Sequence, residues 1–182
     1  MNRILPIYTY DQPILRRKLK PVTEITDEIV ALAIAMHQTM VNAEGIGLAA
    51  NQVGEDRRML VVNVRDEEQE KPTILTMVNP VIEAVSEEEI LSEEGCLSLP
   101  DIRADVVRPE AIEVRYLDTD MKEHLLEAEG LLARVIQHEV DHLDGIYFFD
   151  HLAPMRRGLL KRKLLAVKRG EVEADYPLYS GR

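Results

Sequence analysis

Two histidines four residues apart restrict the conformation of this chain more than any other feature of its sequence. The segment His138-Glu139-Val140-Asp141-His142 lies in a stretch, 131–143, whose apolar residues recur at helical spacing. On an α-helix, residues i and i+4 lie on one face, so both imidazoles can converge on one cation. Glu139, about 100° around the helix axis, can then reach a water on that cation. The pattern is typical of metal-assisted hydrolysis, although it also occurs in metal-free helices whose histidines are half-buried.

A catalytic metal site needs a third protein ligand and an open position for water. Shortly after His142 the chain offers only His151, and its spacing does not match the long-spaced histidine pattern of one protease class. The other candidate is Cys96, a single cysteine that cannot form an internal disulfide. It is a buried apolar residue, a reactive thiol or a metal ligand. Gly95 before it and Pro100 after it mark an irregular segment that suits the presentation of a thiolate.

A third informative segment is Gly45-Ile46-Gly47-Leu48-Ala49-Ala50-Asn51-Gln52. Its two glycines could simply end the preceding helix. No strand precedes them, so a dinucleotide site is not supported. We favour a role in which an extended ligand lies close to the glycine backbone and Gln52 supplies an amide N–H.

Hydrophobic periodicity predicts one domain of the α+β class, because the strands lie between helices and do not alternate with them one by one. Thr26 can cap the first helix. The charged run Asp66–Pro72 reads as a solvated loop between two strands. The predicted helices cover 26–43, 131–143 and 154–169, and the predicted strands cover 59–64, 74–78, 81–85 and 111–117.

The charge distribution is uneven. The chain has a net charge of −11 and a sequence pI of about 4.9, which argues against nucleic acid or an anionic membrane as a partner of the whole chain. No signal peptide and no long apolar run is visible, so we expect a cytoplasmic protein without a membrane partner. By contrast, 156–169 contains seven cations and no acid. This helix is either a solvated face whose leucines pack inward (Leu159, Leu160, Leu164 and Leu165) or a docking surface.

Three segments together resemble, in order and spacing, the signature motifs of the peptide deformylases: 45–52, Glu94-Gly95-Cys96-Leu97-Ser98 and 137–142. The resemblance extends over about residues 4–170. It implies antiparallel β-sheets packed around a central metal-binding helix, with an N-terminal and a C-terminal helix. Residues 1–170 would then form a single catalytic domain, followed by an extended tail over 171–182. The implied reaction removes the N-terminal formyl group from nascent formyl-methionyl polypeptides, as part of protein biosynthesis.

The resemblance also implies roles for individual residues. Cys96 would join His138 and His142 as the third metal ligand, and Glu139 would be general base and then general acid while a metal-activated water attacks the formyl carbon. The side-chain amide of Gln52 and the backbone N–H of Leu97 would stabilise the oxyanion. The backbone at Ile46, Gly47 and Gly95 would pair with the substrate like an added strand. Leu131, Val135 and Ile46 would form the apolar walls of the methionine pocket. We expect the remaining histidines, which lack a partner at ligand spacing, to be structural: His37, His124 and His151.

The implied cofactor is one divalent metal ion, Fe²⁺ in the native protein, with Zn²⁺, Ni²⁺ or Co²⁺ as alternatives in isolated protein. The implied partners are the formyl-methionyl nascent peptide and the ribosome, which the basic helix over 156–169 would contact. Two rival hypotheses remain open at this point. One is a zinc endopeptidase that uses the same His-Glu-x-x-His pattern; the other is a protein without enzymatic activity in which the three ligands hold a structural metal.

Overall fold

The computed structural model describes residues 3–65 and 71–179. Most of the polar loop predicted over 66–72 therefore lies outside the described residues. The order of elements confirms an α+β chain in which a helix is followed by several strands and then by two helices. The α-helices are α1 (Asp27–Asn42), α2 (Gly130–Leu143) and α3 (Pro154–Lys168), and the 3₁₀ turns are η1 (Pro13–Arg16), η2 (Ala50–Val53) and η3 (Phe148–His151). The strands are β1 (Gly47–Ala49), β2 (Met59–Val64), β3 (Thr73–Val85), β4 (Glu89–Cys96), β5 (Leu99–Pro109), β6 (Ala111–Leu117) and β7 (Glu123–Glu129).

The strands form two antiparallel sheets. The larger sheet has the order β1-β2-β3-β6-β7, and the smaller one is the β4–β5 hairpin. Strand β1 is an edge of the larger sheet, where Gly47 pairs with Val62 of β2. Strand β4 likewise pairs only with β5 among the described strands. Two strand edges are thus left open, and they border the cavity described below.

One strand prediction was wrong, and four strands, β1, β4, β5 and β7, were not predicted. The predicted pair over 74–78 and 81–85 is one continuous strand, β3, with a register shift between Val78 and Val81. Asn79, at a φ of 52°, fills the bulge and exchanges two hydrogen bonds with the backbone of Val22. The β4–β5 hairpin was not predicted, because most side chains of β4 are exposed and its sequence has no apolar alternation.

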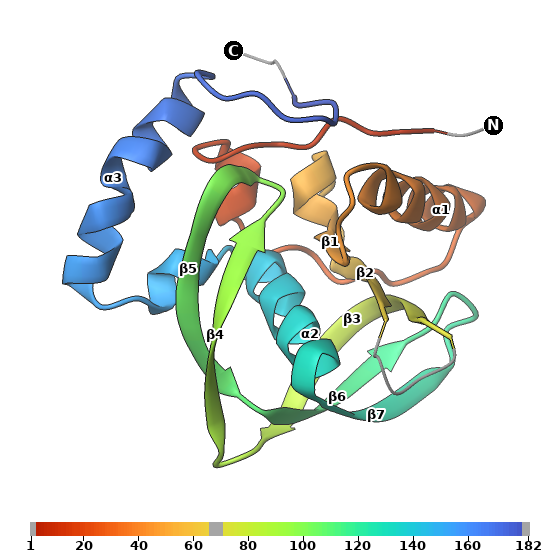
Figure 1. The fold of residues 1–182 in the computed structure, drawn as a ribbon. Helices are drawn as coiled ribbons and strands as arrows, with labels where there is room; N and C mark the ends of the chain where they lie inside the picture. The colour runs from red at the N-terminus through yellow and green to blue at the C-terminus, as the bar shows by residue number, and fades with distance from the viewer. Residues whose placement is uncertain (1–2, 66–70, 180–182) are drawn as a thin grey trace.

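The helices begin and end close to their predicted positions. The hydroxyl of Thr26 accepts a hydrogen bond from the backbone N–H of Ile29, which confirms the N-cap of α1. Helix α2 crosses the middle of the molecule, between the β4–β5 hairpin and the larger sheet, and α3 lies on the outer side of β5 (Figure 1). Almost every residue of α2 from Ala133 to Leu143 is buried. Its polar side chains must therefore find partners inside the protein.

Two apolar clusters hold these layers together. The first joins α1, α2 and the larger sheet, and includes Met36, Leu60 and Ile136. The second joins β5, η3 and α3 through Ile102, Phe148 and their neighbours. Each fully buried side chain of this size contributes about 1.5–3 kcal/mol. The first cluster fixes α2 on one side, and on the other side His138 and His142 contact the rings of Phe148 and Tyr147 from the second cluster, which makes α2 a rigid support for a site.

The first and last described segments lie side by side (Figure 1). Ile7 and Leu178 form a parallel bridge, in which the backbone N–H of Ile7 donates to Pro177 and that of Tyr179 donates to Ile7. No helix among the described residues is long and apolar enough to cross a membrane.

Gly145, which follows α2, gives a test of this packing. Its φ is 75°, and a Cβ there would lie 2.6 Å from the backbone oxygen of Arg16. We expect Gly145→Ala to lower the free energy of unfolding by about 1–3 kcal/mol. The control is Gly158→Ala in α3, where nothing lies within 4 Å of the new Cβ; it should stabilise by about 0.5–1 kcal/mol. Urea denaturation measures both, and a Gly145→Ala variant as stable as wild type would contradict the prediction.

Candidate metal centre and cleft

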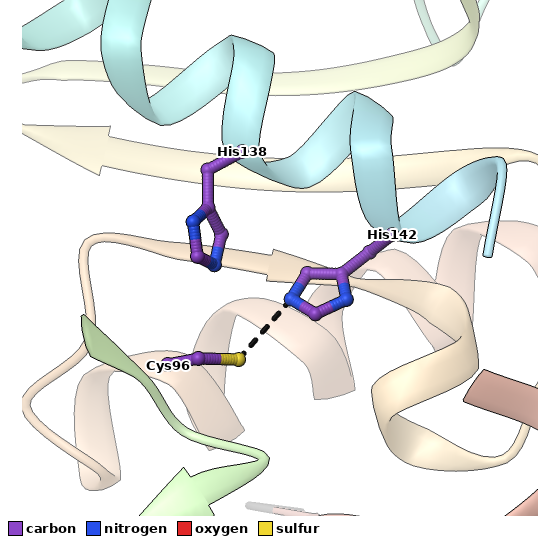
Figure 2. Close-up of side chains that lie close together, drawn as sticks. All are labelled: Cys96, His138 and His142. Atoms are coloured by element: carbon purple, nitrogen blue, oxygen red, sulfur yellow. Dashed lines mark hydrogen bonds between the residues drawn. The ribbon is translucent and has the colours of Figure 1, made fainter. Parts of the chain in front are cut away.

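Three potential metal ligands converge between α2 and the β4–β5 hairpin. His138 and His142 lie one turn apart on α2, and Cys96 is the last residue of β4. Their ligand atoms all lie within 4.8 Å of one another. Figure 2 shows the two imidazoles and the thiol pointing toward a common centre, with the Cys96 Sγ atom 3.1 Å from His142 Nε2. The structure therefore brings the three predicted ligands together.

The orientation of His138 is fixed by a buried carboxylate. His138 Nδ1 lies 2.8 Å from Glu94 Oε2, so the other ring nitrogen is left for a metal. Arg108 binds the same carboxylate through two nitrogens, and Arg134 adds a third. Burial alone would raise the pKa of Glu94, but its hydrogen bonds with His138 and Arg108 hold that pKa well below its usual range.

The charges of the two histidines differ. Burial lowers the pKa of His142 well below its usual value, and the charge of His138 adds to this effect. Burial also opposes protonation of His138, but Cys96 and Glu94 more than offset it and raise its pKa. A donor set that stabilises positive charge at this point suits a cation. One thiolate and two imidazoles are a ligand combination typical of zinc and other transition metals.

Glu139 lines the same cavity as Cys96 and His138 and is 4% exposed. Its Oε2 atom has no hydrogen-bond partner among the described residues. Burial raises the pKa of Glu139 to about 7. A Cβ on Gly47 would collide with Glu139 Oε1 and lie 2.8 Å from Val135 Cγ1. Glycine at this position is what lets β1 approach the carboxylate so closely.

Gln52 is held so that its amide points to the ligands. Its Oε1 atom accepts a hydrogen bond from the backbone N–H of Ala49, and its Nε2 atom lies 3.4 Å from Cys96 Sγ. The same nitrogen donates to the hydroxyl of Ser98. Cys96 and Leu99 pair across the end of the hairpin, so Leu97 and Ser98 form the tight turn between β4 and β5. Leu97 is thus placed directly beside Gln52 and the thiol.

A cavity of about 510 Å³ runs along these residues, between β1 and β4. Every site residue predicted from the sequence lines it except His142, which lies behind Cys96. Leu131, half exposed at the start of α2, and Ile46 lie at its rim. Arg134 also lines the cavity while its guanidinium binds Glu94. The three remaining histidines have other partners: Thr76 for His37, Asp118 for His124 and Asp141 for His151.

Sequence reasoning missed several residues of this site. Glu94 begins one of the three motifs, but no role was predicted for it. An acid directly before Gly95-Cys96 is a signal that a buried carboxylate there binds a partner of the opposite charge. Arg108 lies on a strand that was not predicted, and Tyr176, far along the chain, gave no signal at all. Spacing along one element reveals ligands on that element, but it does not reveal partners from distant segments.

Comparisons with known proteins agree on one family. The family model for polypeptide deformylase matches residues 4–158. A peptide deformylase from Salinibacter ruber is 48% identical over 183 aligned residues, with 96% of this chain and 94% of that protein covered. The crystal structure of the Ehrlichia chaffeensis enzyme with actinonin has a TM-score of 0.85 at 36% identity, covering 94% of this chain and 99% of that one. A Met-Ala-Ser-bound enzyme from Acinetobacter baumannii has a TM-score of 0.79 at 37% identity, covering 84% and 100%.

The buried pair of Arg108 and Glu94 gives a second test. Both side chains are 5% exposed, and removal of one partner leaves a charge without compensation. We expect Arg108→Met to lower the free energy of unfolding by about 3–5 kcal/mol. The matched control is Arg115→Met on β6, whose ion pairs with Glu83 and Glu123 are exposed; it should cost less than about 1 kcal/mol. Thermal and denaturant unfolding measure both variants, and equal losses of stability in Arg108→Met and Arg115→Met would contradict the prediction.

Proposed function

The chain belongs to the peptide deformylase family, and we propose that it hydrolyses the N-terminal formyl group of nascent formyl-methionyl polypeptides, with Glu139 as the proton-transferring residue. The observation that carries the proposal is the position of Glu139. Its buried carboxylate lies at a three-ligand centre, at the wall of a cleft between two open strand edges. The products are formate and a peptide with a free methionine amino group. Nascent chains carry the formyl group as they are made, so the cytoplasm is the proposed compartment.

Cys96, His138 and His142 would hold one divalent cation. When bound, such a cation lowers the pKa of a coordinated water and polarises a carbonyl oxygen. We propose Fe²⁺ as the native metal, because a thiolate with two neutral imidazoles suits it as well as zinc, and the family resemblance favours iron. The hydrogen bond from His138 to Glu94 would orient the ring and increase its basicity.

Glu139 would perform the proton transfers. As general base its carboxylate takes a proton from the attacking water while the water oxygen bonds to the formyl carbon. As general acid it then gives that proton to the nitrogen as the C–N bond breaks. The Oε2 atom of Glu139 supports this role, since it has no hydrogen-bond partner among the described residues. Gly47 supports it as well, because any side chain there would displace the carboxylate.

The negative charge that develops on the formyl oxygen needs donors. We assign this role to the side-chain amide of Gln52 and the backbone N–H of Leu97. The bond from Ala49 fixes which end of the Gln52 amide faces the site. Loss of one such donor typically costs about 10²–10³ in turnover.

The peptide would lie extended between β1 and β4. Backbone groups of Ile46, Gly47 and Gly95 would pair with it as with an added strand, which tolerates many sequences. Leu131 and Val135, with Ile46, would receive the methionine side chain. The Met-Ala-Ser-bound neighbour supports this choice of substrate, since that tripeptide has the sequence of a deformylated chain beginning with methionine.

The rival hypotheses are not supported. All relatives reported above are peptide deformylases, not endopeptidases. A structural metal site is closed by four protein ligands, whereas three converge here among the described residues, beside an open cavity. A structural site would also have no use for Glu139.

The basic helix α3 is the proposed contact with the ribosome. The alternative hypothesis, in which its four leucines pack inward, fails for Leu159, which is 79% exposed, and for Leu165, which is also exposed. Only Leu164 and Val167 are buried in this helix. Arg156, Lys161 and Arg162 have no ion-pair partner within the described chain. A cationic face interrupted by exposed apolar residues suits a surface of RNA and protein.

The Glu139→Gln variant tests the mechanism. Glutamine has nearly the same shape but cannot accept the proton, so kcat for formyl-Met-Ala-Ser should fall by about 10²–10⁴. Bound metal should remain at the wild-type level, because the three ligands are unchanged. The control, Glu127→Gln on the exposed face of β7, should leave kcat unchanged.

Formate release and metal analysis of protein prepared without air measure these effects. Unchanged turnover in Glu139→Gln would refute the mechanism. An acetylated peptide and an internal-cleavage peptide, assayed in parallel, should not be hydrolysed. Cleavage of the internal peptide would favour the endopeptidase.

Reversal of three charges on α3 tests the ribosome contact. We expect the triple Glu variant of Arg156, Lys161 and Arg162 to lose co-sedimentation with ribosomes at low salt. The control reverses three cations elsewhere, at Lys18, Arg65 and Lys122, and changes the net charge equally. Retention of both variants on ribosomes would contradict the proposed docking surface, whereas loss of both would indicate a nonspecific charge effect.

A further inference from the structure

The segment after α3 returns to the active site. The family model ends at residue 158, so this tail lies beyond the matched region. From Glu171 to Tyr179 it runs extended to the N-terminal arm, where the rings of Tyr179 and Tyr8 stack with their centroids 3.8 Å apart. The bridge between Ile7 and Leu178 adds backbone hydrogen bonds. The tail is thus attached firmly enough to place a side chain.

Tyr176 is the side chain that the tail places at the cleft. It lines the cavity, and its hydroxyl donates a hydrogen bond of 2.9 Å to the backbone carbonyl of Leu97. Burial, together with the nearby charge of Cys96, raises the pKa of Tyr176 to about 12. The hydroxyl therefore keeps its proton at neutral pH and remains a donor.

Three oxygen atoms of the Leu97–Ser98 turn, which receives this bond, accept hydrogen bonds from other segments. The carbonyl of Ser98 accepts from the backbone N–H of Tyr10, at 3.0 Å. The hydroxyl of Ser98 accepts from Gln52. The carbonyl of Leu97 accepts from Tyr176. Among the described residues, no hydrogen bond other than that from Tyr176 reaches the Leu97 carbonyl, so this bond fixes the peptide plane that follows Leu97.

This peptide plane matters because the same turn carries two proposed site groups. The backbone N–H of Leu97 is one oxyanion donor, and the thiol of Cys96 is one residue earlier. A two-residue turn is short, so rotation of one peptide plane turns the next. A donor displaced by a fraction of an ångström loses much of its effect on the transition state.

We propose that Tyr176 is a positioning residue of the deformylation reaction: its hydroxyl holds the Leu97 carbonyl and so aims the Leu97 N–H at the formyl oxygen. The inference rests on the proposed function. It adds to the active site a residue of the tail, which touches neither the metal ligands nor Glu139 by any hydrogen bond described above.

The experiment compares Tyr176→Phe with wild type in the full-length, metal-loaded enzyme. Phenylalanine keeps the ring in the cavity wall and removes only the hydroxyl. We expect kcat for formyl-Met-Ala-Ser, per bound metal, to fall about tenfold, a part of the 10²–10³ that loss of a whole donor costs. KM and the melting temperature should stay close to wild type. The control is Tyr179→Phe, which removes a hydroxyl from the same tail outside the cleft; its kcat should not change.

A second measurement tests the contact without using activity. The carbonyl ¹³C resonance of Leu97 should shift in Tyr176→Phe and not in Tyr179→Phe, because a carbonyl that loses a hydrogen bond changes its shielding. If the wild-type protein is active, an unchanged Leu97 resonance or an unchanged kcat in Tyr176→Phe would overturn this inference and leave the proposed function standing. A drop in melting temperature and metal content with unchanged kcat per metal would also overturn it, since that is the result of a merely structural role. Wild-type protein that releases no formate would instead overturn the proposed function on which the inference rests.

Discussion

The buried carboxylate of Glu94 is the interaction on which the geometry of the site depends. The proposed metal ligands come from two elements that share no backbone hydrogen bonds, α2 and the β4–β5 hairpin. Glu94 joins them, since it lies on β4 and binds His138 and Arg134 of α2. Arg108 of β5 completes the connection by binding both Glu94 and Asp141. Removing these charges from water is costly, and only a complete set of partners offsets that cost. The hairpin can therefore dock on α2 in one register, the register that places Cys96 opposite the histidines.

Much of the site could be predicted, because its chemistry is concentrated in short segments. The spacing of His138 and His142 fixes a helix and a shared face whatever the rest of the fold. Asn79 shows the opposite case: its positive φ and its bonds with Val22 join two runs into one strand, and nothing local distinguishes this from a turn. The β4–β5 hairpin was missed because most side chains of β4 are exposed and its buried Glu94 is held by ion pairs, so β4 has no apolar alternation to read. Tyr176 could not be found, since its role depends on where the tail lies in space.

The uneven charge of the chain has a structural counterpart. The acidic body contains the buried network at Glu94, where each charge is paired inside the protein. The cations of α3 lie on an outer helix that covers β5, away from that network (Figure 1). Three of them bind the body: Lys163 donates to the carbonyl of Asp101, and Lys168 and Arg157 pair with Asp11 and Asp150. The charges that build the site and those proposed to recruit a partner are thus separated in space, so one set can change without disturbing the other.

The partial exposure of Cys96 makes its thiol sensitive to oxidation. Its sulfur is half-buried at the wall of an open cleft, so peroxide can reach it, and oxidation to a sulfenic acid would remove the thiolate ligand. A peptide bound along β1 and β4 would cover this wall. The resting protein is therefore more vulnerable than the working one. When formylated chains are scarce, peroxide should therefore inactivate the protein faster than when substrate is abundant.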